Sequence, residues 1–333
     1  PWAAAALLLA GASLLLAWHL LWSRHAGETA RIATAAQARH TVAVLPLVDE
    51  TGRPDLAWTS AGIAESLAST LAESPSLEVI NSVRVFRSLA DLNLVPATLG
   101  STETRQLGEL LDADRLVTGH VRLLGDRILV DVAMWTAGGV PAPPSATHVQ
   151  SGAITDLPRV VVQLGDALRQ EMEIAAPPEP LAPAAVPAAA IEAYGSGVAF
   201  LARGDFVHAA PLFERAVRVD AAFAAAWARL ADADHNLGFD ERAREAASRA
   251  STILQGSNSR IALEARAREA SLAGDPETAQ KTLEALLRHY PNDAEAHITL
   301  AESLAQQGKL PAALGTLREI VQREPNHPRA WYL

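Results

Sequence analysis

The chain has 333 residues and carries 28 Lys and Arg against 38 Asp and Glu, which gives a formal net charge of −10. It contains no Cys, so disulfides and thiolate metal ligands are excluded. Neither half of the sequence has the excess of Lys and Arg that a phosphate-binding face requires. This argues against nucleic-acid contact within these residues. The length suggests about two domains, and much of the 49% apolar fraction is Ala, which adds little buried area.

The first 22 residues contain no charged side chain and read PWAAAALLLAGASLLLAWHLLW. As a helix they would extend about 30 Å, the thickness of the hydrocarbon core of a bilayer. Trp2, Trp18 and Trp22 lie near the two ends, as interfacial aromatic residues do. We therefore expect a transmembrane helix over 1–22 and a connector over 23–39. The alternatives are a buried globular helix and a secretory signal peptide, although no small-x-small cleavage site follows.

Strands and helices alternate over the next part of the chain, which predicts an α/β domain at 40–174. The apolar run at 41–48 is typical of a strand buried on both faces. Gly125-Asp126 separates two runs of alternating apolar residues and predicts a tight antiparallel hairpin. The other expected elements are strands at 77–81 and 146–152, and helices at 59–73, near 83–92 and 102–111, and from Leu157 onward.

Four short segments of this domain carry a family resemblance: Ala43-Val44-Leu45-Pro46, Leu111-Asp112-Ala113-Asp114, Val117-Thr118-Gly119-His120 and Gly125-Asp126-Arg127. Their order along the chain resembles the TolB-amino-terminal-like domain of bacterial envelope sensors. The resemblance implies a binding or sensory module, and it brings no catalytic residue with it.

A Pro- and Ala-rich segment at 175–190 contains five Pro residues and predicts a semi-rigid linker. Beyond it, Gly204, Gly238, Gly274 and Gly308 recur at intervals of 34, 36 and 34 residues. Each is followed five residues later by an Ala. Such a period predicts stacked helical hairpins, in which each Gly ends the first helix of a pair in a left-handed conformation.

The repeating segment, 191–333, resembles the tetratricopeptide repeat. Trp227 and Leu230 occupy the Trp and Leu sites of the second unit, and the fourth unit matches at Leu300, Leu304, Ala313, Leu317 and Pro325. The pattern is broken at Ala231, Asp234 and Arg266. Trp331 follows Trp227 by 104 residues, which predicts about four units and the start of a fifth. We expect the chain, which begins at Pro1, to be a piece of a longer protein.

The resemblance implies a concave face, lined by the first helix of each unit, that binds a protein or peptide partner. The residues it places there are Tyr194, Val198, Leu201, Asp232, His235, Asn236, Arg268 and Glu302. An alternative is that Tyr194, Val198 and Leu201 pack on the linker or on the preceding domain. The basic clamp for a terminal carboxylate that chaperone-binding members use is not present.

The sequence shows no Gly-rich phosphate loop, nucleophile elbow or zinc-spaced His pair. We therefore expect no enzyme, no cofactor, no metal site and no catalytic residue. Asp112 and Asp114 flank a helix-to-strand turn, where capping is their ordinary role. His120 and His148 lie on strands and are expected to be surface or hydrogen-bonded side chains, not metal ligands.

The expected fold class is α+β and multi-domain: a single transmembrane helix, an α/β TolB-like domain and an all-α tetratricopeptide-repeat solenoid. This order resembles the membrane-anchored ToxR/CadC-type winged-helix transcriptional regulators. It implies a single-pass protein of the bacterial inner membrane whose carboxy-terminal part is a periplasmic sensory and protein-interaction portion. Membrane lipid is an implied partner, a homodimer is one arrangement, and DNA would be contacted only through a domain upstream of residue 1. The alternatives are the sensor portion of a membrane Ser/Thr kinase or nucleotide cyclase, and an envelope assembly scaffold.

Overall fold

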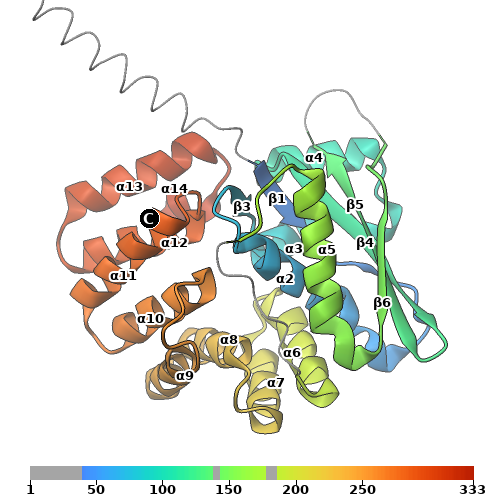
Figure 1. Cartoon of the computed structure of the whole chain (residues 1–333). Helices are drawn as coiled ribbons and strands as arrows, with labels where there is room; N and C mark the ends of the chain where they lie inside the picture. Colours follow the sequence, from blue (N-terminus) through green and yellow to red (C-terminus); the bar gives the residue numbers. More distant parts are fainter. Residues whose placement is uncertain (1–39, 138–142, 178–185) are drawn as a thin grey trace, which may run out of the picture. The chain divides into compact units, whose positions relative to one another are not determined.

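The structure, a computed structural model, describes residues 40–137, 143–177 and 186–333. They belong to one compact unit, His40–Leu333. Within this unit a small sheet with helices on both faces is followed along the chain by an array of paired helices (Figure 1). We call these two parts the sheet domain and the repeat array.

The expected membrane-anchored fold class is corrected by this architecture. Within the described ranges, every helix is too short or too polar to cross a lipid bilayer. The fold is a helical repeat array that follows a small sheet domain. The inner-membrane location inferred from a single transmembrane helix is wrong because no described helix could cross a bilayer. The segment 1–22, with Trp2, Trp18 and Trp22, lies outside the described residues, as does the connector 23–39.

The sheet has the strand order β3-β1-β4-β5-β6. The central strand β4 (Arg115–Leu124) pairs in parallel with β1 (His40–Val44), which pairs in parallel with β3 (Leu77–Val79). On the other side β4 pairs antiparallel with β5 (Arg127–Thr136), and β5 pairs antiparallel with β6 (His148–Gly152). The expected hairpin is confirmed, and Gly125 at its turn has φ +67°.

The run expected to form one strand at 41–48 is broken at Pro46. The amide of Leu45 still donates to the carbonyl of Val117 over 2.9 Å. Pro46 has no N–H to continue the ladder. Pairing resumes in parallel at the short strand β2 (Val48–Asp49), opposite His120 and Val121 of β4.

Strand β1 is buried on both faces, as expected for its apolar run. Val42 and Val44 belong to the core under α2 (Trp58–Ala72) and α5 (Leu157–Glu171), whereas Ala43 and Leu45 belong to the core under α3 (Ser82–Asp91) and α4 (Ser101–Leu111). Short 3-10 helices complete the connections: η1 (Pro54–Leu56), η2 (Pro96–Thr98) and η3 (Ile154–Asp156).

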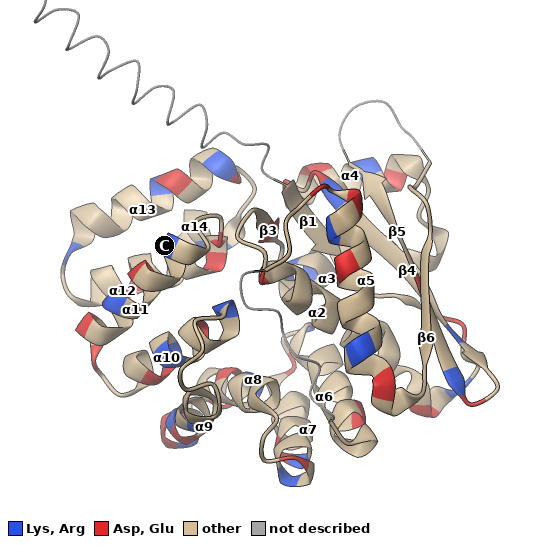
Figure 2. Ribbon diagram, viewed as in Figure 1, with Lys and Arg blue, Asp and Glu red and all other residues tan. Residues whose placement is uncertain are grey.

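The repeat array consists of helix pairs. They are α6 (Ala188–Leu201) with α7 (Phe206–Val219), α8 (Ala224–Asn236) with α9 (Asp240–Ile253), α10 (Arg260–Leu272) with α11 (Pro276–His289), and α12 (Ala294–Gln306) with α13 (Leu310–Arg323); α14 (Pro328–Tyr332) follows. The expected left-handed glycines are confirmed, since Gly204, Gly238, Gly274 and Gly308 have φ between +73° and +80°. Both signs of charge occur on the helices of the array (Figure 2).

The repeats reproduce the same local bond at the two Trp sites. The indole Nε1 of Trp227 donates to the carbonyl of Ala221 over 3.0 Å, and that of Trp331 donates to the carbonyl of Pro325 over 2.7 Å. Each bond ties a helix, α8 or α14, to the loop that directly precedes it. Asp234, which replaces an expected aromatic residue, is 1% exposed and forms an ion pair of 3.0 Å with Arg242 of the partner helix α9.

Candidate functional site

The first helix of the repeat array packs directly on the sheet domain through glycines. A Cβ built on Gly195 of α6 would lie 2.3 Å from Cε3 of Trp58, and one built on Gly62 of α2 would lie 2.8 Å from the Cα of Gly195. Contacts this short are forbidden to side chains, so only glycine allows the two backbones and the indole to approach. Helix α2 therefore lies against the concave side of the first repeat unit.

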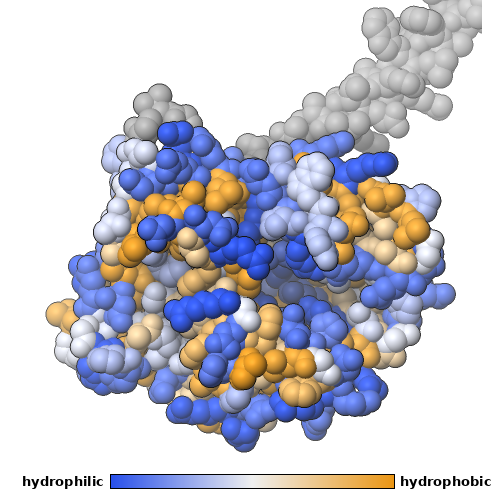
Figure 3. All heavy atoms as spheres, turned by 180° about the vertical axis from the view of Figure 1, so that it is seen from behind, coloured by the Kyte–Doolittle hydropathy of each residue, from blue (hydrophilic) through white to orange (hydrophobic). Residues whose placement is uncertain are grey.

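Beside this contact lies a chamber with a volume of about 490 Å³. Helices α2 and α5 of the sheet domain form one wall, and α6, α8, α9 and α10 of the array form the other. This volume falls in the range of small-ligand and peptide pockets. The chamber is thus bounded by the concave face of the first three repeat units and by the sheet domain. The face of the molecule opposite to that in Figure 1 is hollowed near its centre and carries hydrophilic residues around the hollow (Figure 3).

One side of the chamber is apolar. The residues that form it are Leu157, Val161, Val162, Val186, Ile191, Phe223, Ala224, Ala225 and Ala228. Ala225 and Ala228 lie on α8, where their small side chains leave the space that a Leu or Phe would fill. The volume of the chamber therefore depends on the Ala content of the first helices.

A polar strip crosses the other side on α8 and α10. Arg229 binds Glu65 of α2 over 2.5 Å and Asp232 over 3.2 Å. Asp232 also forms an ion pair with Arg268 over 2.8 Å. Glu264 forms one with Arg260 over 3.1 Å. The strip therefore offers donors and acceptors in alternation, with each cation already balanced by a carboxylate.

Burial and neighbouring charges together set the protonation of Tyr194 and of Arg229. Burial raises the pKa of the Tyr194 hydroxyl to about 12, with the nearby Arg229 opposing the shift. For Arg229 itself burial disfavours the charge, but Glu65, Tyr194 and Asp232 outweigh it and keep its pKa well above the ordinary value. Tyr194 therefore stays neutral and Arg229 stays cationic at any physiological pH.

At the end of α2 the carboxylate of Glu73 caps a helix of the repeat array. It accepts the amides of Arg260 (2.8 Å) and Ile261 (3.2 Å) at the start of α10, and the hydroxyl of Tyr290 (3.2 Å). These first-turn amides have no partner within their own helix, and the helix dipole favours an anion there. Burial nevertheless raises the pKa of Glu73. The sheet domain thus supplies a helix cap that is 187 residues away in sequence.

The structure places the predicted binding residues in three groups. Tyr194, Asp232 and Arg268 line the chamber. Val198 and Leu201 are 1% and 7% exposed and belong to the core shared by α6 and α7.

The remaining predicted residues of the array lie away from the chamber lining. His235 pairs with Asp240 over 3.2 Å, and the amide of Asn236 donates to the carbonyl of Asp232 over 2.8 Å. Glu302 pairs with Arg329 over 2.6 Å.

Sequence reasoning did not find the sheet-domain wall of the chamber, which includes Trp58 and Glu73, nor Glu65, which pairs with the strip. Trp58 and Glu65 lie on α2 and Glu73 directly follows it, and the apolar stripe of this helix predicts only a helix against a sheet. The unusual content of small residues around Gly62 was the available signal, because such residues permit close helix contacts. Across the described part of the chain, no three His, Asp or Glu side chains are grouped to hold a metal ion.

Comparison with known proteins identifies part of the repeat array. Residues 270–333 match the family model described as tetratricopeptide repeat. No curated protein matches the chain. Similar solved structures include YrrB, described as a TPR protein with an unusual peptide-binding site, which is 19% identical over 43% of this chain and 73% of YrrB with a TM-score of 0.33.

MamA is also similar, being 15% identical over 43% of this chain and 77% of MamA with a TM-score of 0.34. The family match shows that residues 270–333 carry tetratricopeptide repeats, a type of protein-interaction domain.

Proposed function

We propose that this chain is a recognition module that binds an extended peptide segment of a protein partner in the chamber between α2 and the first repeat units. The observation that carries the proposal is the chamber itself, which adjoins the first helices of three successive units. The tetratricopeptide match over 270–333 supports a protein or peptide as the partner.

The dimensions of the chamber suit such a segment. Packed helices lie about 8–10 Å apart, so three successive first helices span roughly 20 Å. An extended chain covers about 3.3 Å per residue, and about six residues therefore follow this path. Alternate side chains of an extended segment point to the same side. One set would contact the apolar side of the chamber, around Val161, Ile191 and Phe223.

The charges favour a segment that is neutral or weakly basic. The lining contains Arg229, Arg260 and Arg268, and four carboxylates: Glu73, Asp220, Asp232 and Glu264. The partner backbone, which is uncharged and carries both N–H and C=O groups, can hydrogen-bond to the polar strip without displacing its ion pairs. An acidic segment would meet Asp232 and Glu264 and is disfavoured.

We further propose that the module serves a sensory role. The resemblance of 40–174 to the TolB-amino-terminal-like domain supports this assignment, and so does its order before the linker 175–190 and the repeats 191–333. We assign the module to a winged-helix type of regulator whose DNA contacts lie in a domain outside this chain, with no catalytic step in the module. A ligand can drive such a regulator only through its different affinity for two conformations.

The proposal is tested by selecting peptides from a displayed random library on the chain 40–333. Ala228→Trp places a bulky side chain in the chamber from the half-exposed face of α8. Ala312→Trp places the same side chain on the exposed surface of α13 and serves as the matched control. We expect selected peptides to lose at least tenfold in affinity for the Ala228→Trp protein and to bind the control as tightly as wild type. Equal binding to all three proteins would refute the site.

A further inference from the structure

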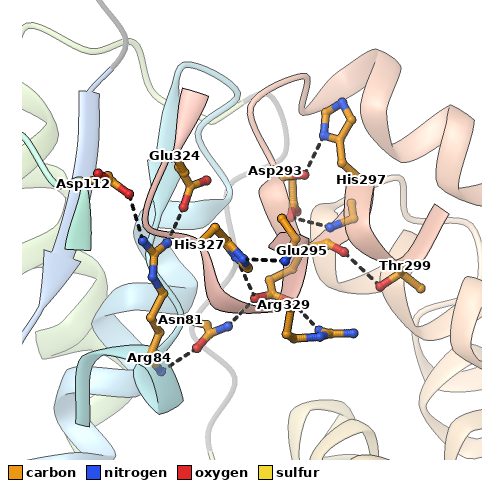
Figure 4. Close-up of polar contacts among 12 residues, drawn as sticks. Asn81, Arg84, Asp112, Asp293, Glu295, His297, Thr299, Glu324, His327 and Arg329 are labelled. Atoms are coloured by element: carbon orange, nitrogen blue, oxygen red, sulfur yellow. Dashed lines mark hydrogen bonds and ion pairs between the residues drawn. The ribbon is translucent and has the colours of Figure 1, made fainter. Parts of the chain in front are cut away.

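The far end of the repeat array contacts the sheet domain through a second set of residues, which we call the far cluster. It consists of Asn81, Arg84 and Asp112 from the sheet domain and Glu295, Glu324 and His327 from the array (Figure 4), together with Asn326. All of its side chains are polar or charged. The contact between Gly62, Gly195 and Trp58, which we call the near contact, is by comparison apolar and tightly packed.

Arg84 lies at the centre of the far cluster and is 8% exposed. One guanidinium nitrogen binds the carboxylate of Glu324 in the loop after α13. The other donates to the carbonyl of Leu111 over 2.9 Å and lies 3.3 Å from Asp112. One buried cation thus connects α3, the end of α4 and the fourth repeat unit.

Two Asn side chains complete the connection. Asn326 of the array donates its backbone amide to Asp112 over 2.9 Å, and its side-chain amide to Asp112 over 2.9 Å and to the carbonyl of Glu109 over 3.0 Å. Asn81 donates to Glu295 of α12. Asp112 adopts a left-handed conformation with φ +55°, which directs it away from α4 as that helix ends. The far cluster therefore depends on directional bonds.

We propose that the far cluster is a releasable latch. While it is closed, α12 to α14 rest on β3 and α3. When it opens, α12 to α14 move away from the sheet domain, while the near contact and the bonds of Glu73 to α10 and Tyr290 hold the earlier units in place. The device goes beyond the proposed function, since it concerns how the last repeat units are held to the sheet domain and requires no identified ligand.

The physical reason is the different response of the two contacts to small changes. The near contact resists opening in proportion to its apolar area and has no group to titrate. A buried charge pair holds only while both partners are present, because a single buried charge is strongly disfavoured. The loss of any one charge in the far cluster thus removes most of its contribution at once.

His327 adds a further buried contact to the latch. It is 3% exposed and caps α14, since its Nδ1 accepts the amide of Ala330 over 3.4 Å. Its Nε2 lies 3.7 Å from Glu295. His327 therefore connects the start of α14 to Glu295 of α12. The other charged groups around this site are Glu78, Arg84, Asp112, Glu324 and Arg329.

The latch is tested by measuring distances in solution. The chain lacks Cys, so two introduced cysteines can be spin-labelled specifically. Asp91→Cys at the end of α3 and Gln322→Cys on α13 report across the far cluster. Gln163→Cys on α5 and Val207→Cys on α7 report across the near contact, and all four positions are exposed. We measure pulsed-electron-resonance distance distributions for each pair, with and without Arg84→Met.

We expect Arg84→Met to add a longer-distance population at the 91–322 pair and to leave the 163–207 pair unchanged. The double variant Arg84→Met, Glu324→Met removes both charges and is expected to restore the short distance. Arg53→Met at the exposed Arg53–Asp55 pair is the control and should change neither distance. If Arg84→Met fails to fold, Asn326→Ala tests the latch instead, because Asn326 is exposed and its side chain binds Asp112 and Glu109. We expect it to add a smaller long-distance population at the 91–322 pair. An unchanged 91–322 distribution in a folded variant would overturn the latch, and so would equal lengthening of both pairs.

Discussion

Replacing Gly195 with Ala tests whether the repeat array is fixed to the sheet domain as described. The added Cβ would lie 2.3 Å from the Trp58 ring. Ordinary contact requires about 3.5 Å or more between carbons, so α2 and α6 must separate by about 1 Å or the indole must rotate. Overpacking of this kind costs about 1–3 kcal/mol.

The helix itself gains from the same substitution. Ala is favoured over Gly in a helix interior by about 1 kcal/mol. The net loss of stability at Gly195 is therefore about 0–2 kcal/mol. Gly315→Ala on α13 provides the matched control, because a Cβ there would meet nothing within 4 Å. That variant should gain about 0.5–1 kcal/mol.

The assay is urea unfolding of both variants and of wild type, followed by far-ultraviolet circular dichroism. The difference in unfolding free energy between Gly195→Ala and Gly315→Ala isolates the steric cost, since the propensity gain cancels. We expect Gly195→Ala to be the less stable by about 1–3 kcal/mol. If the two variants were equally stable, α2 and α6 would not be in close contact, and the near wall of the chamber would be wrong.

Three further predictions concern Phe213, Glu73 and Glu295. Phe213 is fully buried under Tyr194, so Phe213→Ala should lower the unfolding free energy by about 3–5 kcal/mol in urea titrations; a loss below 1 kcal/mol would contradict the packing of the first repeat unit. Because burial raises the pKa of Glu73 above its ordinary value of 4.5, its contribution to stability is fully present below that value and declines as the pH rises through the folded pKa. Glu73→Gln should abolish this part of the pH dependence of the melting temperature, and an unchanged profile would show that Glu73 is not buried. Glu295 behaves oppositely: burial would raise its pKa, but His327, Arg329 and Asn81 lower it below 4.5. Its contribution is present above 4.5 and lost as the pH falls through the folded pKa, so the 91–322 distance should lengthen on acidification below that range, and a distance that stays constant down to acid unfolding would exclude this coupling.

Features set by local chemistry could be predicted from the sequence. The two-sided burial of β1 follows from its apolar run, the β4–β5 hairpin follows from Gly125, and the helix ends of the array follow from periodic glycines. In each case the signal lies within a few residues or within one repeat period. The break at Pro46 was also readable in principle, because a proline cannot continue a central strand ladder.

Features set by contacts between distant segments could not be predicted. Glu73 caps a helix that begins at Arg260, and Arg84 pairs with Glu324, 240 positions away. Nothing in the sequence around Glu73 or Arg84 distinguishes either residue from an ordinary charged residue of the surface. The repeat pattern assigned Val198 to an open concave face, whereas its side chain is buried in the core shared by α6 and α7.

The most direct test of the central claim, that the chamber is where a partner binds, is amide hydrogen exchange with and without a selected peptide. We expect slower exchange in α2, α8 and α10, whose residues line the chamber, and unchanged exchange in α11 and α13. Protection confined to α11 and α13, with no change in α2, α8 or α10, would contradict the claim.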